Sequence, residues 1–172
     1  MNALADPRVV DYMNETFICT YLKVGTFQIV NGQKQGGNVA SYFCLPDGSV
    51  VHAIPGQVGA DKLIAEARWA HEIRKSALTL ATDLGTGNTD PRKFRDKIVK
   101  AHAERYHAEG TEWSGHRAYV PVPAVMPRHR SQQAQVHWLL ARHPLAKLDK
   151  VYPTVWKEIL QESLSDRPVA VR

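Results

Sequence analysis

The chain has 172 residues, of which 44% are hydrophobic and 23% charged, and its formal net charge is +5 at pH 7. These proportions are those of ordinary globular proteins and exclude a disordered chain. No apolar run reaches the roughly 18 residues of a membrane span. The N-terminal stretch MNALADPRVVDYMNE carries acidic and polar side chains, unlike a secretory signal. We therefore expect a soluble chain without a membrane span, and for the chain as given we favour the cytoplasm.

The N-terminal stretch predicts a helix followed by a strand. Apolar residues recur at helical spacing through DPRVVDYM, where Asp6 is a suitable N-cap and Pro7 suits the first helical position. The sequence FICTYLKV comes next and is rich in aromatic and β-branched residues, which predicts a strand. The glycine-rich NGQKQGGN after it predicts a polar loop.

The stretch NVASYFCLPDGSVVHAIPG predicts a β-hairpin. Two apolar strands, over residues 39–45 and 50–54, are joined by the turn Pro46-Asp47-Gly48-Ser49. Proline presets the turn backbone and Asp-Gly tolerates a positive φ, so the register of the two strands is well specified. Pro55-Gly56 ends the second strand.

Helical patterns dominate the chain after the hairpin. GADKLIAEARWAHEIRKSALTLA predicts a long amphipathic helix. Its apolar stripe consists of Leu63, Ile64, Ala67, Ala70, Ile73 and Ala77. TDLGTGNTD breaks this helix and predicts a boundary between a domain over residues 1–82 and an extension over residues 83–172. Three more helices are predicted in the extension, in DPRKFRDKIVKAHAERYH, SQQAQVHWLLARH and LDKVYPTVWKEILQESL, and the proline-rich HRAYVPVPAVMP reads as extended.

Two of these stretches, DPRVVDYMNETFICTYLKV and NVASYFCLPDGSVVHAIPGQVGADKLIAEA, resemble the C-terminal part of a thioredoxin-like domain. The resemblance covers residues 6–75 and implies an α/β fold, with an incomplete thioredoxin-like sheet and a mostly α-helical C-terminal extension that packs on it or on a partner. Members of that family carry Cys-x-x-Cys at a helix N-terminus, which stabilises the thiolate. They also carry a cis-proline before the hairpin. This chain has no Cys-x-x-Cys, and Val39 stands about where the proline would be, so we expect a trans peptide bond there.

The absence of both hallmarks leads us to expect a redox-inactive thioredoxin-like protein, without a cofactor and not an enzyme, that acts by protein binding or scaffolding. Loss of a central strand would leave backbone ladder groups unpaired, so we expect a protein partner or a second copy of the chain to complete the sheet. RAYVPVP is the other candidate for that role.

An oxidoreductase-related protein, with a catalytic front half that is missing or encoded upstream, stays open as an alternative. Its candidate thiols are Cys19 and Cys44, the two cysteines of the chain. Each lies inside an apolar run, where a free cysteine is expected to be a small buried hydrophobe.

A basic stretch makes a nucleic-acid-binding module the third hypothesis. Six basic residues lie between positions 92 and 107, namely Arg92, Lys93, Arg95, Lys97, Lys100 and Arg105, against two acidic ones. The sequence RHR over residues 128–130 adds to them. A solvated helix face explains the same charges.

Eight histidines raise the question of a metal site, for which His102, His107 and His116 are the candidates. His102 and His107 are five residues apart and face different sides of a helix, and no His-Glu-x-x-His motif is present. We therefore expect these residues, together with His129, His137 and His143, to be surface or capping histidines that bind no metal.

Overall fold

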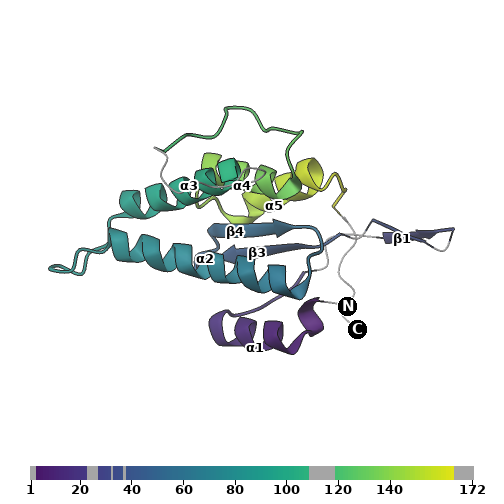
Figure 1. Cartoon of the computed structure of the whole chain (residues 1–172), viewed down its shortest axis with the longest axis horizontal. Helices are drawn as coiled ribbons and strands as arrows, with labels where there is room; N and C mark the ends of the chain where they lie inside the picture. The colour runs from purple at the N-terminus through teal and green to yellow at the C-terminus, as the bar shows by residue number, and fades with distance from the viewer. Residues whose placement is uncertain (1–2, 23–26, 32, 37, 109–118, 165–172) are drawn as a thin grey trace.

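The computed structural model describes residues 3–22, 27–31, 33–36, 38–108 and 119–164 (Figure 1). In chain order the elements are η1 (Ala3–Ala5), α1 (Pro7–Thr16), β1 (Phe27–Val30), β2 (Gln33–Gly36), β3 (Ala40–Cys44), β4 (Val50–Pro55), α2 (Ala60–Ala81), α3 (Pro91–Ala108), α4 (Gln132–Arg142), α5 (Leu148–Thr154) and the π-helical η2 (Val155–Ile159). Strands lie in the first part and helices dominate the rest. The predicted α/β class with a helical C-terminal part is confirmed.

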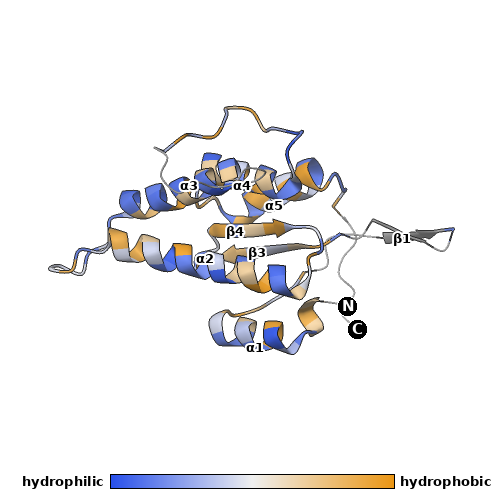
Figure 2. Ribbon diagram, viewed as in Figure 1, coloured by the Kyte–Doolittle hydropathy of each residue, from blue (hydrophilic) through white to orange (hydrophobic). Residues whose placement is uncertain are grey.

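The predicted hairpin is formed by β3 and β4, which pair antiparallel with Tyr42 opposite Ala53 and Phe43 opposite His52. Gly48 in the turn has φ +80°, a conformation that glycine adopts without the steric cost of a side chain. No peptide bond among the described residues is cis, which confirms the trans bond expected before Val39. Every residue of β4 is buried, and Figure 2 shows this strand as hydrophobic along most of its length.

Helices enclose the hairpin from two directions (Figure 1). On one face, apolar residues of α2 and α1 pack against the hairpin in a cluster that contains Val9, Phe43, Ile54, Leu63 and Ala67. On the side of β4 that faces away from β3, α4 packs against β4 and against α3, and α3 reaches β4 through apolar residues around Val51. Burial on both sides explains why a two-stranded sheet is stable here, since an isolated hairpin is marginal in water.

The outer edge of β4 is covered by groups from the helical part of the same chain. The carbonyl oxygen of Val51 accepts a hydrogen bond from His102 Nε2 at 2.8 Å, and the carbonyl oxygen of Ala53 accepts one from Gln133 Nε2 at 3.1 Å. The amide of Val50 donates to the carbonyl oxygen of Ala146 at 2.9 Å. Neither RAYVPVP nor a partner chain is needed at this edge, and the described part of RAYVPVP, residues 119–123, forms no strand.

Two predictions near the N-terminus are wrong. Residues 17–22 of FICTYLKV form no strand, and they take part in no strand pairing among the described residues. The loop predicted over NGQKQGGN contains β2 instead, which pairs with β1 so that Gly36 lies opposite Phe27. Helix α1 is confirmed, with the side chain of Asp6 accepting from the amide of Arg8 and Pro7 at the first position.

The predicted helices of the C-terminal part are confirmed, with one interruption. The segment over residues 82–90 separates α2 from α3, as predicted, and Asp90 caps α3 by accepting from the amide of Arg92 at 2.8 Å. The last predicted helix divides into α5 and η2, next to Pro153, which has no N–H for a helical hydrogen bond. None of the described helices combines the length and the apolar character needed to span a membrane.

Candidate functional site

The two candidate cysteines lie at the surface. Cys19 and Cys44 are both free thiols and both exposed, so the expectation that they are buried is wrong. Cys19 lies in the irregular segment after α1, and Cys44 is the last residue of β3. Partial burial of the sulfur raises the pKa of Cys44, and the negative charge of Asp47 adds to this effect. This environment disfavours the thiolate and supplies no activation for redox chemistry.

The predicted basic patch divides into two parts. Arg92, Lys93, Arg95 and Lys100 are exposed on α3, and Lys97 is half-buried. Arg105 turns inward instead. Its guanidinium group forms an ion pair with Glu66 of α2 and lies 4.6 Å from the ring centre of Trp69. The sixth member of the predicted patch therefore belongs to a buried polar cluster rather than to an exposed cationic face.

The histidines are distributed differently from the prediction. His107 is half-buried, with Nε2 3.1 Å from the carbonyl oxygen of Val120, and His116 lies outside the described residues. His102 and His137 are buried, with exposed fractions of 0% and 2%, so their predicted surface location is wrong. Both lie beside a histidine that the sequence analysis does not select, His52.

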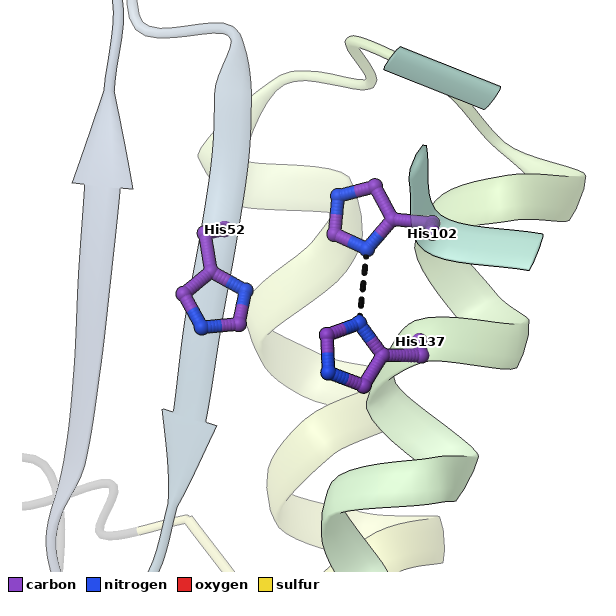
Figure 3. A group of neighbouring side chains, drawn as sticks. All are labelled: His52, His102 and His137. Atoms are coloured by element: carbon purple, nitrogen blue, oxygen red, sulfur yellow. Dashed lines mark hydrogen bonds between the residues drawn. The ribbon is translucent and has the colours of Figure 1, made fainter. Parts of the chain in front are cut away.

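His52, His102 and His137 form a compact group that we call the histidine cluster (Figure 3). The three rings come from β4, α3 and α4, and their centres are 5.1 to 5.9 Å apart. One potential ligand atom of each lies within 4.8 Å of the other two. Three separate elements therefore place three imidazole rings around one point.

Hydrogen bonds define the proton positions on two of these rings. Because a carbonyl oxygen only accepts, the contact with Val51 places a proton on His102 Nε2 and leaves His102 Nδ1 as an acceptor. His137 Nδ1, 2.9 Å away, must then be the donor to it. His137 Nε2 in turn is left to accept from Gln133 Nε2 at 3.5 Å. The chain of donors runs from Gln133 through His137 and His102 to Val51.

His52 is held by a second polar group. Its Nε2 lies 2.9 Å from a carboxylate oxygen of Glu66, which also binds Arg105. The Trp69 ring system packs against the imidazole in an edge-to-face arrangement, with ring centres 4.7 Å apart. His52 Nδ1 is buried and has no hydrogen-bond partner among the described residues. It points toward the other two rings of the histidine cluster (Figure 3).

Burial keeps the three imidazoles neutral. It lowers the pKa of His102 to about 3, and it lowers the pKa values of His52 and His137 as well. Burial raises the pKa of Glu66, but the hydrogen bond from His52 and the charge of Arg105 outweigh it, so that the net shift is downward. At neutral pH the cluster thus holds three uncharged imidazoles, whose ring nitrogens can bind a metal cation, beside the ion pair of Glu66 and Arg105.

Sequence reasoning missed His52 and Glu66, although each carries a signal. His52 interrupts the apolar strand VVHAIP, where a polar side chain needs a buried partner. Glu66 falls on the apolar stripe of α2, three residues after Leu63 and four before Ala70, so that a carboxylate occupies a core position.

A second feature is the exposed apolar segment that follows α1. Relative to a fully exposed reference residue, the solvent-accessible areas of Ile18, Tyr21 and Leu22 are 104%, 93% and 71%. Their segment starts at Phe17, whose ring packs on Phe43 of β3 with centres 5.4 Å apart. We call residues 17–22 and the outer edge of β3 the β3 edge surface.

The backbone of β3 adds hydrogen-bonding groups to this surface. The carbonyl of Ala53 points away from β3, toward Gln133, so Ala53 and Tyr42 form a non-hydrogen-bonded pair. The N–H and C=O of Tyr42 therefore point outward as well. Among the described strands, β3 pairs only with β4.

Comparison of the chain with protein-family models, with curated proteins and with solved structures finds no match. The thioredoxin-like relationship therefore stays a prediction. The elements on which this prediction depends are the hairpin β3–β4, the turn at Gly56 and the helix α2 that follows.

Proposed function

We propose that the chain is a redox-inactive, thioredoxin-like binding protein that holds an extended segment of a partner protein on the β3 edge surface. The observation that carries this proposal is the exposure of three large apolar side chains, Ile18, Tyr21 and Leu22, in the segment whose first residue, Phe17, packs on Phe43 of β3. An extended peptide added to a strand edge gains backbone hydrogen bonds, and apolar side chains nearby provide specificity.

The state of the thiols supports the redox-inactive part of the proposal. A thiol–disulfide oxidoreductase needs a thiolate with a lowered pKa and a second cysteine to resolve the mixed disulfide. Here the pKa of Cys44 is raised, and no disulfide joins it to Cys19. Wild-type protein should therefore fail to catalyse insulin reduction by dithiothreitol. Turnover that disappears in Cys44→Ser would show that the chain is a thiol enzyme.

Site-specific photo-crosslinking tests the binding part. A photoreactive phenylalanine at position 21 should give a defined covalent adduct when the chain is expressed in its native cell. Leu84 offers a matched control position, because it is also apolar and 96% exposed but lies in the segment between α2 and α3. The same probe at position 84 should not give that adduct.

Substitutions then test the surface itself. Ile18→Lys should remove the adduct formed at position 21, and Leu84→Lys should leave it unchanged. An adduct that persists in Ile18→Lys, or that forms equally from position 84, would refute binding at the β3 edge surface. Absence of any adduct at position 21 would refute it too.

A further inference from the structure

We propose that His52, His102 and His137 bind one divalent transition-metal ion, with Zn²⁺ as the preferred ion. The three side chains reach one point from β4, α3 and α4, and one ligand atom of each lies within 4.8 Å of the others (Figure 3). Three histidines with an open fourth position form a common tetrahedral zinc site. This site is independent of the β3 edge surface.

The distances between the nitrogens suit such an ion. Two imidazole nitrogens on a tetrahedral zinc are about 3.3 Å apart, given Zn–N bonds of about 2.0–2.1 Å. The Nδ1 atoms of His102 and His137 are 2.9 Å apart, and one ring nitrogen of each of the three histidines lies within 4.8 Å of the other two. To bind zinc, the Nδ1 atoms of His102 and His137 need to move apart by a few tenths of an ångström, and the ring of His52 needs to move closer to them.

Each imidazole has a group that can orient it from behind. In metal sites, the histidine nitrogen that does not bind the metal usually donates to a carboxylate, a carbonyl or another acceptor. Here Glu66 lies at Nε2 of His52, the carbonyl of Val51 at Nε2 of His102, and the amide of Gln133 near Nε2 of His137. All three Nδ1 atoms are thereby left to face the centre of the cluster.

A hydrogen-bond network without a metal leaves one atom of the cluster unexplained. The donor chain from Gln133 to Val51 accounts for His102 and His137, and Glu66 accounts for Nε2 of His52. His52 Nδ1 has no partner among the described residues, although it is fully buried and points into the cluster. Leaving a buried acceptor unsatisfied is costly, and a metal ion would use its lone pair.

Metal binding requires one proton to move within the cluster. His137 carries its proton on Nδ1 in the donor chain and must carry it on Nε2 when Nδ1 binds the metal. The neighbouring side-chain oxygen of Gln133 is buried without a hydrogen-bond partner among the described residues. After the amide rotates, this oxygen can accept a hydrogen bond from His137 Nε2, and the bond from Gln133 Nε2 to the carbonyl oxygen of Ala53 is then broken. His52 and His102 already carry their protons on Nε2. No proton leaves the protein in this step.

Refolding of the full chain with a metal tests the proposal, because the buried cluster limits entry of an ion into the folded protein. The chain is unfolded with guanidinium and a chelator, refolded with or without Co²⁺ or Zn²⁺, and passed through a desalting column. We expect one Co²⁺ retained per chain, with a visible absorption spectrum distinct from that of aqueous Co²⁺, and a higher melting temperature with Zn²⁺. No retained metal would overturn the proposal.

His52→Gln and His129→Gln provide a matched pair, since His129 is exposed and lies outside the cluster. The first variant should lose stoichiometric Co²⁺ and the second should retain it. Retention in His52→Gln would overturn the site. If His52→Gln does not fold, as judged by circular dichroism, nitrogen NMR of the wild-type imidazoles decides. Zn²⁺ should shift Nδ1 of all three cluster histidines, and shifts confined to other histidines would overturn the proposal.

Discussion

Glu66 is the residue on which the charges of the buried cluster depend. Its carboxylate accepts from His52 Nε2 and neutralises Arg105, whose side chain is 34% exposed. Glu66→Gln keeps the shape but leaves the guanidinium without its counter-charge. Loss of one partner of a buried ion pair is strongly destabilising. Because Arg105 is partly exposed, we expect the free energy of unfolding to fall by about 2 kcal/mol, below the full range for buried pairs. Urea denaturation of metal-free protein measures this change.

Glu104→Gln is the matched control for this prediction. Glu104 also lies on a helix and pairs with a base, Lys100, but at 3.9 Å and with both side chains exposed by about half, 42% and 52%. Such surface pairs contribute less than about 1 kcal/mol. Equal effects of the two substitutions would show that Glu66 has no special role.

Cys44 allows a test of the local electrostatics at a single thiol. Partial burial and the charge of Asp47 raise its pKa, so at any pH below that value a smaller fraction is thiolate than in a free cysteine. In a Cys19→Ser background, the pH profile of alkylation by iodoacetamide should therefore lie at higher pH than that of a cysteine peptide. A profile at lower pH would indicate an activated thiol and would contradict the redox-inactive proposal.

At the scale of elements, the turn of the β3–β4 hairpin is joined to the start of α5 by the side chain of Lys147 and by a backbone hydrogen bond from Leu148 to Gly48. Lys147 Nζ donates to the carbonyl and carboxylate oxygens of Asp47 at 2.8 and 2.7 Å, and it lies 3.1 Å from Ser49 Oγ. Next to it, the amide of Val50 donates to Ala146. We expect Lys147→Met to accelerate hydrogen exchange at the Val50 amide. Lys150→Met, at an exposed position three residues later, should leave the exchange unchanged.

The same contact has a defined pH dependence. The hydrogen bond from Lys147 lowers the pKa of Asp47 to about 2, below its unfolded value of about 3.9. A carboxylate with a lowered folded pKa stabilises the fold above the unfolded pKa, and this contribution is lost as the pH falls through the folded value. Protection of Val50 by this contact should hold down to about pH 4. Its loss near pH 6 would argue against the role of Asp47.

Elements with local signals could be predicted from the sequence, and those that depend on distant partners could not. The turn at Gly48 and the helix α2 are determined by residues close together in the sequence, and both predictions are confirmed. Residues 17–22 have strand propensity, but a strand also needs a backbone beside it, and propensity contains no information on that. His52 and His102 are 50 positions apart in the chain, so periodicity within one helix could not bring them together.

At the scale of the whole molecule, the helical part completes the hairpin. A missing strand predicts unpaired backbone groups at a sheet edge only if no side chains can act as their hydrogen-bond partners. His102 and Gln133 provide such partners at the outer edge of β4. Within this hairpin the other strand edge is that of β3, which pairs with no further described strand, and a protein partner or a second copy there stays a prediction.

Three buried neutral histidines make the stability of the metal-free protein depend on pH. Their folded pKa values are lowered, so between the unfolded value of about 6.5 and the folded values the unfolded chain binds more protons. Stability should thus be constant above about pH 7 and fall as the pH decreases below 6.5. Each histidine lowers the free energy of unfolding by up to about 1.4 kcal/mol for each pH unit of acidification, once it is fully charged in the unfolded state.

Urea denaturation of chelator-treated protein measures this effect. The pH is varied from about 7.5 to about 5, which spans the pKa of an unperturbed histidine. Carboxylates with lowered pKa values, such as Asp6 and Asp83, act in the same direction but only below about pH 5, where their unfolded forms begin to bind protons. The slope above that pH therefore reports the histidines. His102→Asn should reduce it, whereas His143→Gln, at an exposed position, should not. A flat profile in the wild type would mean that the cluster is hydrated and that its imidazoles titrate as they do in the unfolded chain.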